Sequence, residues 1–208
     1  MWTKLNDIKH LALLLIDLQE LDVSPNHGAL SQESPEVVSK YLRNIYDRVL
    51  PNTKRALSIF RSLGAEVIHV RIQSTTADGR DRSWAHKRLG LHVPPSSPLA
   101  KFLPGVEPQG DEIILNKTSS DAFHTTILAQ LLRNMDIKEL VVCGVFTHEC
   151  VSSTTRSACD LNFSVTVIGD ACAATTDDLH MQALEELNLR YARVIETESL
   201  IEELKSIQ

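Results

Sequence analysis

The chain has 208 residues, of which 43% are apolar and 23% are charged, proportions typical of a globular protein with a substantial core. Its 21 Lys and Arg residues and 27 Asp and Glu residues give a formal net charge of −6, without a long run of either sign. A nucleic-acid binder or a protein of anionic membrane surfaces would carry a basic patch, so neither partner is expected.

The first apolar run, residues 11–16, is far too short to span a bilayer. Charged residues occupy the N-terminal positions where a signal peptide would be apolar, so we expect a cytoplasmic protein. Four cysteines lie in the last third of the chain without CxxC spacing, and free thiols are expected in that compartment.

Strand patterns and helix patterns alternate along the chain. Apolar runs predict strands over residues 11–16, 66–71, 111–115, 139–143, 163–168 and 192–195. Helical spacing predicts helices over residues 35–63, 81–89, 148–161, 178–189 and 198–207, with Pro51 breaking or restarting the first. A further helix, capped by one of residues 119–121, should run to about residue 135. The alternation predicts a parallel α/β sheet with helices on both faces, in one domain covering residues 1–208.

Three reactive side chains are expected at one edge of this sheet. Asp17 follows the first strand, Lys117 follows the third, and Cys150 lies one turn beyond the fourth, in the first turn of a helix. Ligands of open parallel sheets bind at the carboxyl ends of the strands. The helix dipole would favour the Cys150 thiolate, a carboxylate could accept the thiol proton, and an ammonium could stabilise negative charge. Each residue also has a structural reading, as a turn residue, a solvated lysine or a buried thiol.

Four motifs, in this order along the chain, strengthen the catalytic reading. They are residues 14–19 (LLIDLQ), 117–123 (KTSSDAF), 144–151 (GVFTHECV) and 169–173 (GDACA). Together they resemble the isochorismatase-like cysteine hydrolases, which include nicotinamidases, N-carbamoylsarcosine amidases, ureidoacrylate hydrolases and biuret hydrolases. The resemblance implies a three-layer α-β-α fold with a parallel, six-stranded, Rossmann-like sheet, assembled as a homodimer or homotetramer.

The resemblance also implies a role for each site residue. Cys150 would attack a carbonyl carbon, Asp17 would act as the base, and Lys117 would tune and position the thiol. A cis peptide bond is expected between Val145 and Phe146, and the backbone N–H groups of Phe146 and Cys150 would hold the oxyanion. Formation of the thioester would release ammonia or an amine, and water would then hydrolyse the thioester.

Two departures from the family pattern narrow the reaction. Metal-dependent nicotinamidases carry an Asp-x-His pair after the second strand, whereas residues 70–75 read VRIQST. His86 and His92 are isolated in sequence and are assigned structural or solvent-exposed roles, so we expect neither a metal nor another cofactor. Isochorismatases that cleave a vinyl ether have glycine in place of the nucleophile, and Cys150 argues against that reaction.

The segment of residues 78–95 most resembles the branch that acts on ureido or carbamoyl amides, and it is rich in hydrogen-bond donors. A solvated loop or a subunit interface is an equally good interpretation of this segment. The substrate would be a small amide or ureido compound that could also carry a carboxylate. The candidates for binding it are Gln19, Arg71, Gln73, Arg82, Lys87 and Phe123, although Phe123 fits packing beside the site better.

Other functions stay open at this point. The chain could be an isochorismatase-type hydrolase of another small substrate, or a catalytically silent binding protein on the same fold. A zinc site built from Cys143, His148 and Cys150 is a third reading, although a turn between strand and helix places these side chains poorly for one ion.

Overall fold

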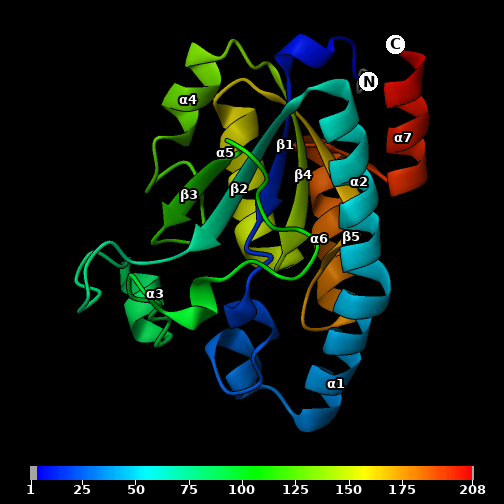
Figure 1. Ribbon diagram of the computed structural model, residues 1–208. Coiled ribbons are helices and arrows are strands. Elements are labelled where there is room, and N and C mark those ends of the chain that lie inside the picture. The colour runs from blue at the N-terminus through cyan, green and yellow to red at the C-terminus, as the bar shows by residue number, and fades with distance from the viewer. Residues whose placement is uncertain (1–3, 208) are drawn as a thin grey trace.

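The computed structural model describes residues 4–207 and contains one six-stranded parallel sheet with the strand order β3-β2-β1-β4-β5-β6 (Figure 1). All five strand pairings are parallel. The strands are β1 (Leu11–Ile16), β2 (Glu66–Ile72), β3 (Ile113–Lys117), β4 (Glu139–Val145), β5 (Ser164–Ala173) and β6 (Arg193–Ile195). This is the α/β architecture that the alternating sequence pattern predicts.

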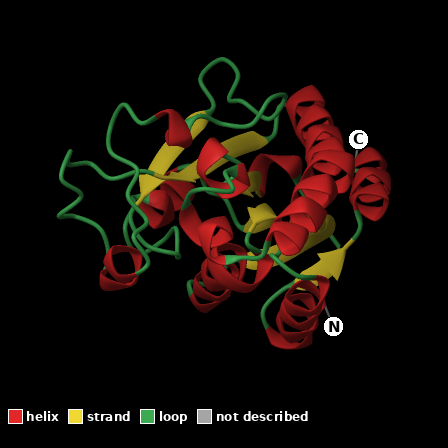
Figure 2. Cartoon of the chain, turned by 90° about the horizontal axis from the view of Figure 1, so that it is seen from below, coloured by secondary structure: helices red, strands yellow, loops and turns green. Residues whose placement is uncertain are grey.

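Helices cover both faces of the sheet and form a three-layer α-β-α arrangement. They are α1 (Pro35–Asn44), α2 (Leu50–Leu63), α3 (Trp84–Arg88), α4 (Leu128–Asn134), α5 (Ser152–Asp160), α6 (Asp177–Arg190) and α7 (Thr197–Ser206). Helices α2 and α7 pack against each other on one face, while α5 and α6 pack together on the other (Figure 1). Figure 2 shows the strands from below with helices flanking them on both sides. No helix within residues 4–207 is long and apolar enough to cross a bilayer.

Strand β1 lies at the centre of the sheet, hydrogen-bonded to β2 and β4, and all six of its residues are buried. Its continuous apolar sequence suits a strand that is covered on both faces. The carboxyl ends of β1, β2 and β4 point down in Figure 1, toward α3 and toward the short 3-10 helices η2 (Glu20–Val23) and η3 (Gly28–Gln32). The strand order also changes direction at β1, which is where parallel sheets form ligand sites.

The long helical segment after β1 keeps its predicted limits, and of the two predicted effects of Pro51 the structure shows the restart, because α2 begins at Leu50. A π-helical turn, η4 (Ile45–Val49), joins α1 to α2, and the Leu50 N–H donates to the Ile45 carbonyl. Pro51 is the second residue of α2, where the absence of a backbone N–H is tolerated. The wider turn therefore lets one continuous helical segment pass through the proline.

Three other predicted boundaries are wrong in instructive ways. Strand β3 begins and ends two residues later than predicted, so Lys117 is its last residue. Strand β5 continues to Ala173, because its second half pairs with the end of β4 through Gly144 and Val145. The helix expected to be capped by one of residues 119–121 begins only at Leu128.

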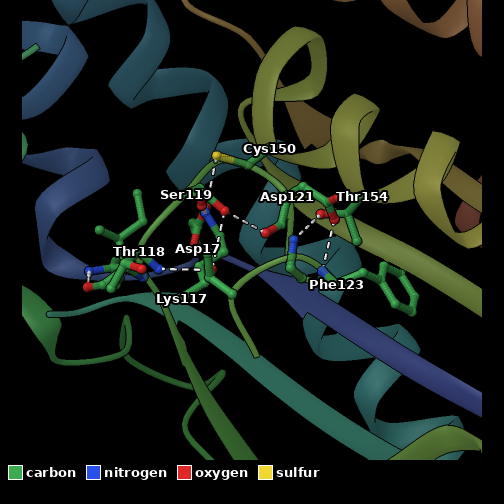
Figure 3. Close-up of polar contacts among 12 residues, drawn as sticks. Asp17, Lys117, Thr118, Ser119, Asp121, Phe123, Cys150 and Thr154 are labelled. Carbon is green, nitrogen blue, oxygen red and sulfur yellow. Dashed lines mark hydrogen bonds and ion pairs between the residues drawn. The ribbon is translucent and has the colours of Figure 1, made fainter. Parts of the chain in front are cut away.

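The segment before α4 is irregular because its polar side chains bind the backbone. Asp121 Oδ1 accepts the Phe123 N–H at 2.8 Å, and its Oδ2 accepts the Ser157 hydroxyl at 2.6 Å. Thr154 Oγ1 on α5 accepts the Ala122 N–H at 3.1 Å. These bonds satisfy the backbone without a helical turn and hold the segment against α5 (Figure 3).

Candidate active site

Asp17, Lys117 and Cys150 converge at the carboxyl edge of the sheet (Figure 3). Asp17 follows β1, Lys117 ends β3, and Cys150 lies in a π-helical turn, η6 (Thr147–Val151), directly before α5. Lys117 Nζ is 2.8 Å from Asp17 Oδ2 and donates to Cys150 Sγ at 3.3 Å and to the Ser119 carbonyl at 2.9 Å. The exposed fractions of Asp17 and Lys117 are 0% and that of Cys150 is 4%, so solvent does not screen these contacts.

The backbone at Asp17 reverses sharply where β1 ends. Asp17 has a φ of 54°, in the left-handed region that non-glycine residues rarely adopt. Its N–H donates to the Val70 carbonyl at 2.9 Å, and its carbonyl accepts the Gln19 N–H at 2.9 Å. Hydrogen bonds to β2 and within the turn hold this conformation, which is the usual situation for strained residues at functional sites.

The ion pair of Asp17 is close but poorly aligned. Oδ2 lies at ion-pair distance from Lys117, yet neither carboxylate oxygen has a hydrogen bond of good geometry among the described residues. A buried carboxylate in this state is under-satisfied. It is therefore able to accept a further proton or hydrogen-bond donor.

The turn that presents Cys150 depends on Gly144. Gly144 has a φ of 125°, and a Cβ atom there would lie 2.0 Å from the Ile16 carbonyl oxygen. The following peptide bond, Val145–Phe146, is cis, at the position that the family resemblance predicts. The N–H groups of Glu149 and Val151 then both donate to the Phe146 carbonyl, at 3.0 and 3.3 Å.

Contacts with helices α6 and α1 also hold this turn in place. Thr147 Oγ1 and His180 Nδ1 form a buried hydrogen bond of 2.8 Å, which ties η6 to α6. The Phe146 ring lies against Tyr41 of α1 with a centroid separation of 5.4 Å. The cysteine is thus held by contacts on both faces of the sheet, as a nucleophile that must be positioned accurately requires.

Burial dominates the electrostatics of the three residues. It raises the pKa of Asp17, and the Lys117 charge opposes that rise only in part. It would lower the pKa of Lys117, but the adjacent Asp17 and Cys150 reverse this and raise it, so the ammonium persists. Burial also raises the pKa of the Cys150 thiol well above its ordinary value, against the lowering effect of Lys117.

Burial therefore opposes the Cys150 thiolate that the helix dipole was expected to favour. A dipole acts weakly compared with the cost of placing a thiolate in a position that is 4% exposed. The resting cysteine is a neutral thiol beside a carboxyl group and an ammonium. Its activation requires transfer of the thiol proton to a neighbouring base.

Cys150 opens into a small enclosed cavity of about 80 Å³. Apolar side chains and a few polar groups line it: Asp22, Gly28, Ala29, Gln32, Ile72, His86, Leu89, Leu91, Ser120, Phe146, Glu149 and Cys150. Sequence reasoning missed Asp22, although it lies only five residues after Asp17 in the same loop. His86, assigned a structural or solvent role, is 1% exposed and lines this cavity instead.

None of the six residues proposed to bind substrate lines the cavity at Cys150. Gln19 is fully buried. Its side-chain amide donates to the carbonyls of Ile72 and Leu99 and accepts the Ile72 N–H. These hydrogen bonds join β2 to the 3-10 helix η5 (Pro98–Ala100). Arg71 and Gln73 line a separate, open hollow of about 710 Å³. Arg71 donates there to Gln73, Asn116 and the Ala100 carbonyl.

The other three side chains have structural contacts of their own. Arg82 donates to the carbonyls of Gly79 and Leu91 and thereby shapes the loop around α3. Lys87 donates to the Arg80 carbonyl. Phe123 stacks on Phe163 with a centroid separation of 6.0 Å, as the packing interpretation suggested. Within residues 4–207, no group of three or more His, Cys, Asp or Glu side chains could hold a metal ion. This includes the alternative zinc site of Cys143, His148 and Cys150.

Comparison with known proteins identifies similar sequences and structures. The family model of the isochorismatase domain matches residues 11–199. YddQ, an isochorismatase family protein of Bacillus subtilis, is 32% identical over 200 residues, which are 91% of this chain and 98% of YddQ. The maleamate amidohydrolase of Pseudomonas putida is 26% identical over 153 residues, covering 73% of this chain and 72% of that enzyme. A solved isochorismatase family protein from Desulfovibrio vulgaris superimposes with a TM-score of 0.78 and 26% identity, covering 94% of this chain and 98% of its own.

Proposed function

Because the chain belongs to the isochorismatase family of hydrolases, we propose that it cleaves a C–N bond of a small amide, ureido or carbamoyl compound through a Cys150 thioester. One observation carries this proposal. The Lys117 ammonium contacts both Asp17 and Cys150 at the wall of an enclosed cavity. A nucleophile, a base and a fixed cation beside a substrate-sized space are the components of thiol-dependent acyl transfer.

The first half-reaction forms the thioester. Asp17 accepts the proton of the Cys150 thiol as the sulfur attacks the carbonyl carbon. Lys117 stabilises the negative charge as it passes from the Asp17 carboxylate to the Cys150 sulfur. The raised pKa of Asp17, caused by burial, makes it a stronger base than an ordinary aspartate. The N–H groups of Phe146 and Cys150 are the proposed donors to the oxyanion, and such a donor contributes about 3–4 kcal/mol in studied acyl-transfer enzymes.

Protonated Asp17 then gives its proton to the departing nitrogen, and ammonia or an amine leaves as the C–N bond breaks and the thioester forms. The second half-reaction restores the thiol. Asp17 then takes a proton from water, whose oxygen attacks the thioester carbonyl. Breaking the C–S bond returns that proton to sulfur, and the acid product departs. One water is consumed for each C–N bond cleaved.

Two further observations support this reaction class. The Pseudomonas putida relative is named as an amidohydrolase, and its similarity extends over most of both chains. The proposal includes no metal, because the segment after β2 lacks an Asp-x-His pair and the described residues contain no group of metal ligands. The cavity of about 80 Å³ suits a compact substrate.

The test is release of ammonia across a panel of small carboxamide and ureido compounds. Cys150→Ala and Cys150→Ser should each reduce the rate to the uncatalysed level, and quenched wild-type reactions should contain an acyl adduct on Cys150 detectable by mass spectrometry. Cys159→Ser is the matched control, because it removes a thiol from α5 that does not line the cavity. Hydrolysis by Cys150→Ala at the wild-type rate would refute the mechanism.

A further inference from the structure

Two polar side chains in the wall of the Cys150 cavity have buried atoms without a partner. Asp22 of η2 is 6% exposed, and His86 of α3 is 1% exposed. Asp22 Oδ2 and His86 Nδ1 make no hydrogen bond to any described residue. A native protein rarely leaves such atoms unsatisfied, because each has given up its hydrogen bonds with water and gained none in return. Both side chains line the cavity wall, where a bound ligand can supply the missing partners.

The charges around this cavity are unevenly distributed. Glu149 adds a second carboxyl group to the wall, and none of the described lining residues is lysine or arginine. Lys117 contacts Cys150 at this cavity, but Asp17 and Ser119 also bind its ammonium. The Arg82 guanidinium donates to backbone carbonyls within its own loop.

We propose that the cavity selects substrates in which the scissile amide neighbours a positively charged group, with Asp22 as the residue that recognises the cation. This inference rests on the proposed function and adds a substrate class to it. It reverses the expectation of a carboxylate-bearing substrate, since a carboxylate would meet two carboxyl groups and no lysine or arginine among the described lining residues.

The physical states of the two residues fit this role. Burial and the neighbouring Asp17 carboxylate raise the pKa of Asp22 well above its ordinary value, which favours its protonated form. An entering ammonium gives the ionised form a partner, and Asp22 releases its proton to solvent as the ion pair forms. Burial, with the charges of Lys117 and Arg82, lowers the pKa of His86 to about 4. A neutral imidazole can accept a hydrogen bond from the same cationic group.

Two thiol reagents of similar shape and opposite charge can test the inference at Cys150. We would label the full-length protein with 2-aminoethyl methanethiosulfonate or 2-carboxyethyl methanethiosulfonate and follow each cysteine by peptide mass spectrometry. Half-exposed Cys159 provides the internal reference for intrinsic reactivity. The preference for the cationic reagent should be at least about 100-fold larger at Cys150 than at Cys159, because the ammonium can form an ion pair with Asp22 while the carboxylate reagent finds no lysine or arginine among the described lining residues.

Three variants assign the effect to the proposed residue. Asp22→Asn should reduce the excess preference below about tenfold, because the isosteric amide cannot pair with an ammonium. Glu149→Gln, at a half-buried position that tolerates change, should reduce it by a smaller factor. Asp47→Asn removes the same charge from an exposed site outside this cavity and should leave the preference unchanged.

The inference is overturned by equal preferences at Cys150 and Cys159, by an unchanged preference in Asp22→Asn, or by failure of both reagents to reach Cys150. These readouts need only a reactive thiol and therefore do not depend on hydrolysis. A parallel ammonia-release assay compares glycinamide, which is cationic near neutral pH, with malonamate, which is anionic. Selective labelling without ammonia release from any amide would keep the cation site and reject the proposed function.

Discussion

The Lys117 ammonium lies 2.8 Å from Asp17 Oδ2 although neither side chain is exposed to solvent. Removing two charges from water costs several kcal/mol for each ion, and good pairing must offset that cost. Lys117 obtains three close partners, whereas the oxygens of Asp17 lack well-aligned hydrogen bonds. The pair therefore leaves the carboxylate under-satisfied beside the thiol whose proton we propose it accepts.

Replacing Asp17 by asparagine should affect both turnover and stability. Turnover should fall by about 10²–10⁴-fold, because the amide cannot accept the thiol proton. The free energy of unfolding should fall by about 3–5 kcal/mol, because Lys117 would stay buried without its counter-charge. Steady-state ammonia release and urea denaturation measure the two effects.

Asp177→Asn is the matched control for this substitution. It removes the partner of Lys40 from an ion pair on the protein surface, where both side chains are largely exposed. Surface pairs of this kind contribute little, so turnover and stability should stay close to wild type. An Asp17→Asn protein that behaves like this control would contradict the proposed role of the buried pair.

The reactivity of Cys150 should report a high thiol pKa in the resting protein. Burial raises that pKa, so alkylation by iodoacetamide should keep increasing with pH and show no plateau below about pH 9. Lys117→Met should slow alkylation further, because the ammonium lowers the pKa of the thiol. Peptide mass spectrometry of timed reactions gives the rates.

Lys138→Met serves as the comparison, since Lys138 pairs with Asp136 at an exposed site. It should leave the pH profile of Cys150 unchanged. A plateau already reached at neutral pH would indicate a preformed thiolate and would restore the helix-dipole interpretation of the sequence.

Much of the site's location follows from elementary pattern rules. The apolar run of β1 predicts a strand buried on both faces, and the parallel-sheet rule then places Asp17, Lys117 and Cys150 at one edge. The structure brings these three side chains into contact. The state of the thiol could not be predicted in the same way, because it depends on burial by residues from many parts of the chain.

The loop residues show where sequence reasoning ends. Arg82 looks like a substrate-binding donor in the sequence, but the folded loop uses its guanidinium to bind the carbonyls of Gly79 and Leu91. Asp22 resembles an ordinary turn residue, and only the approach of α3 reveals it as part of a cavity wall. The conformation of a loop decides which of its hydrogen-bond donors stay free to bind a substrate. No periodic sequence pattern predicts this conformation for residues 73–108.

His86 should make the protein less stable as the solution becomes mildly acidic. Its pKa is lowered to about 4 in the folded protein from an ordinary value of 6.5, so the unfolded chain binds the proton first. The stability associated with neutral His86 is complete above about pH 6.5 and is lost as the pH falls toward 4, by about 3 kcal/mol. Urea denaturation across this range measures the loss.

Other groups also titrate in this window, and burial raises the pKa of Asp17 and Asp22, which gives an effect of the opposite sign. The informative quantity is therefore the stability difference between wild type and His86→Gln, which should become less favourable to wild type as the pH falls. His92→Gln, at an exposed position in the same loop, is the matched control for the substitution itself. A constant difference for His86→Gln would show that its ring is already solvated.

Gly144→Ala should destabilise the turn that presents Cys150. The new methyl group would lie 2.0 Å from the Ile16 carbonyl oxygen, a backbone atom that cannot move without disturbing the pairing of β1 and β4. The φ of 125° adds conformational strain, so we expect a loss of about 3 kcal/mol or more. Gly64→Ala is the control, because Gly64 also has a positive φ but no atom within 4 Å of the added methyl, and it should cost only about 1 kcal/mol. Equal losses in denaturation experiments would mean that strain alone, and not contact with β1, requires glycine at position 144.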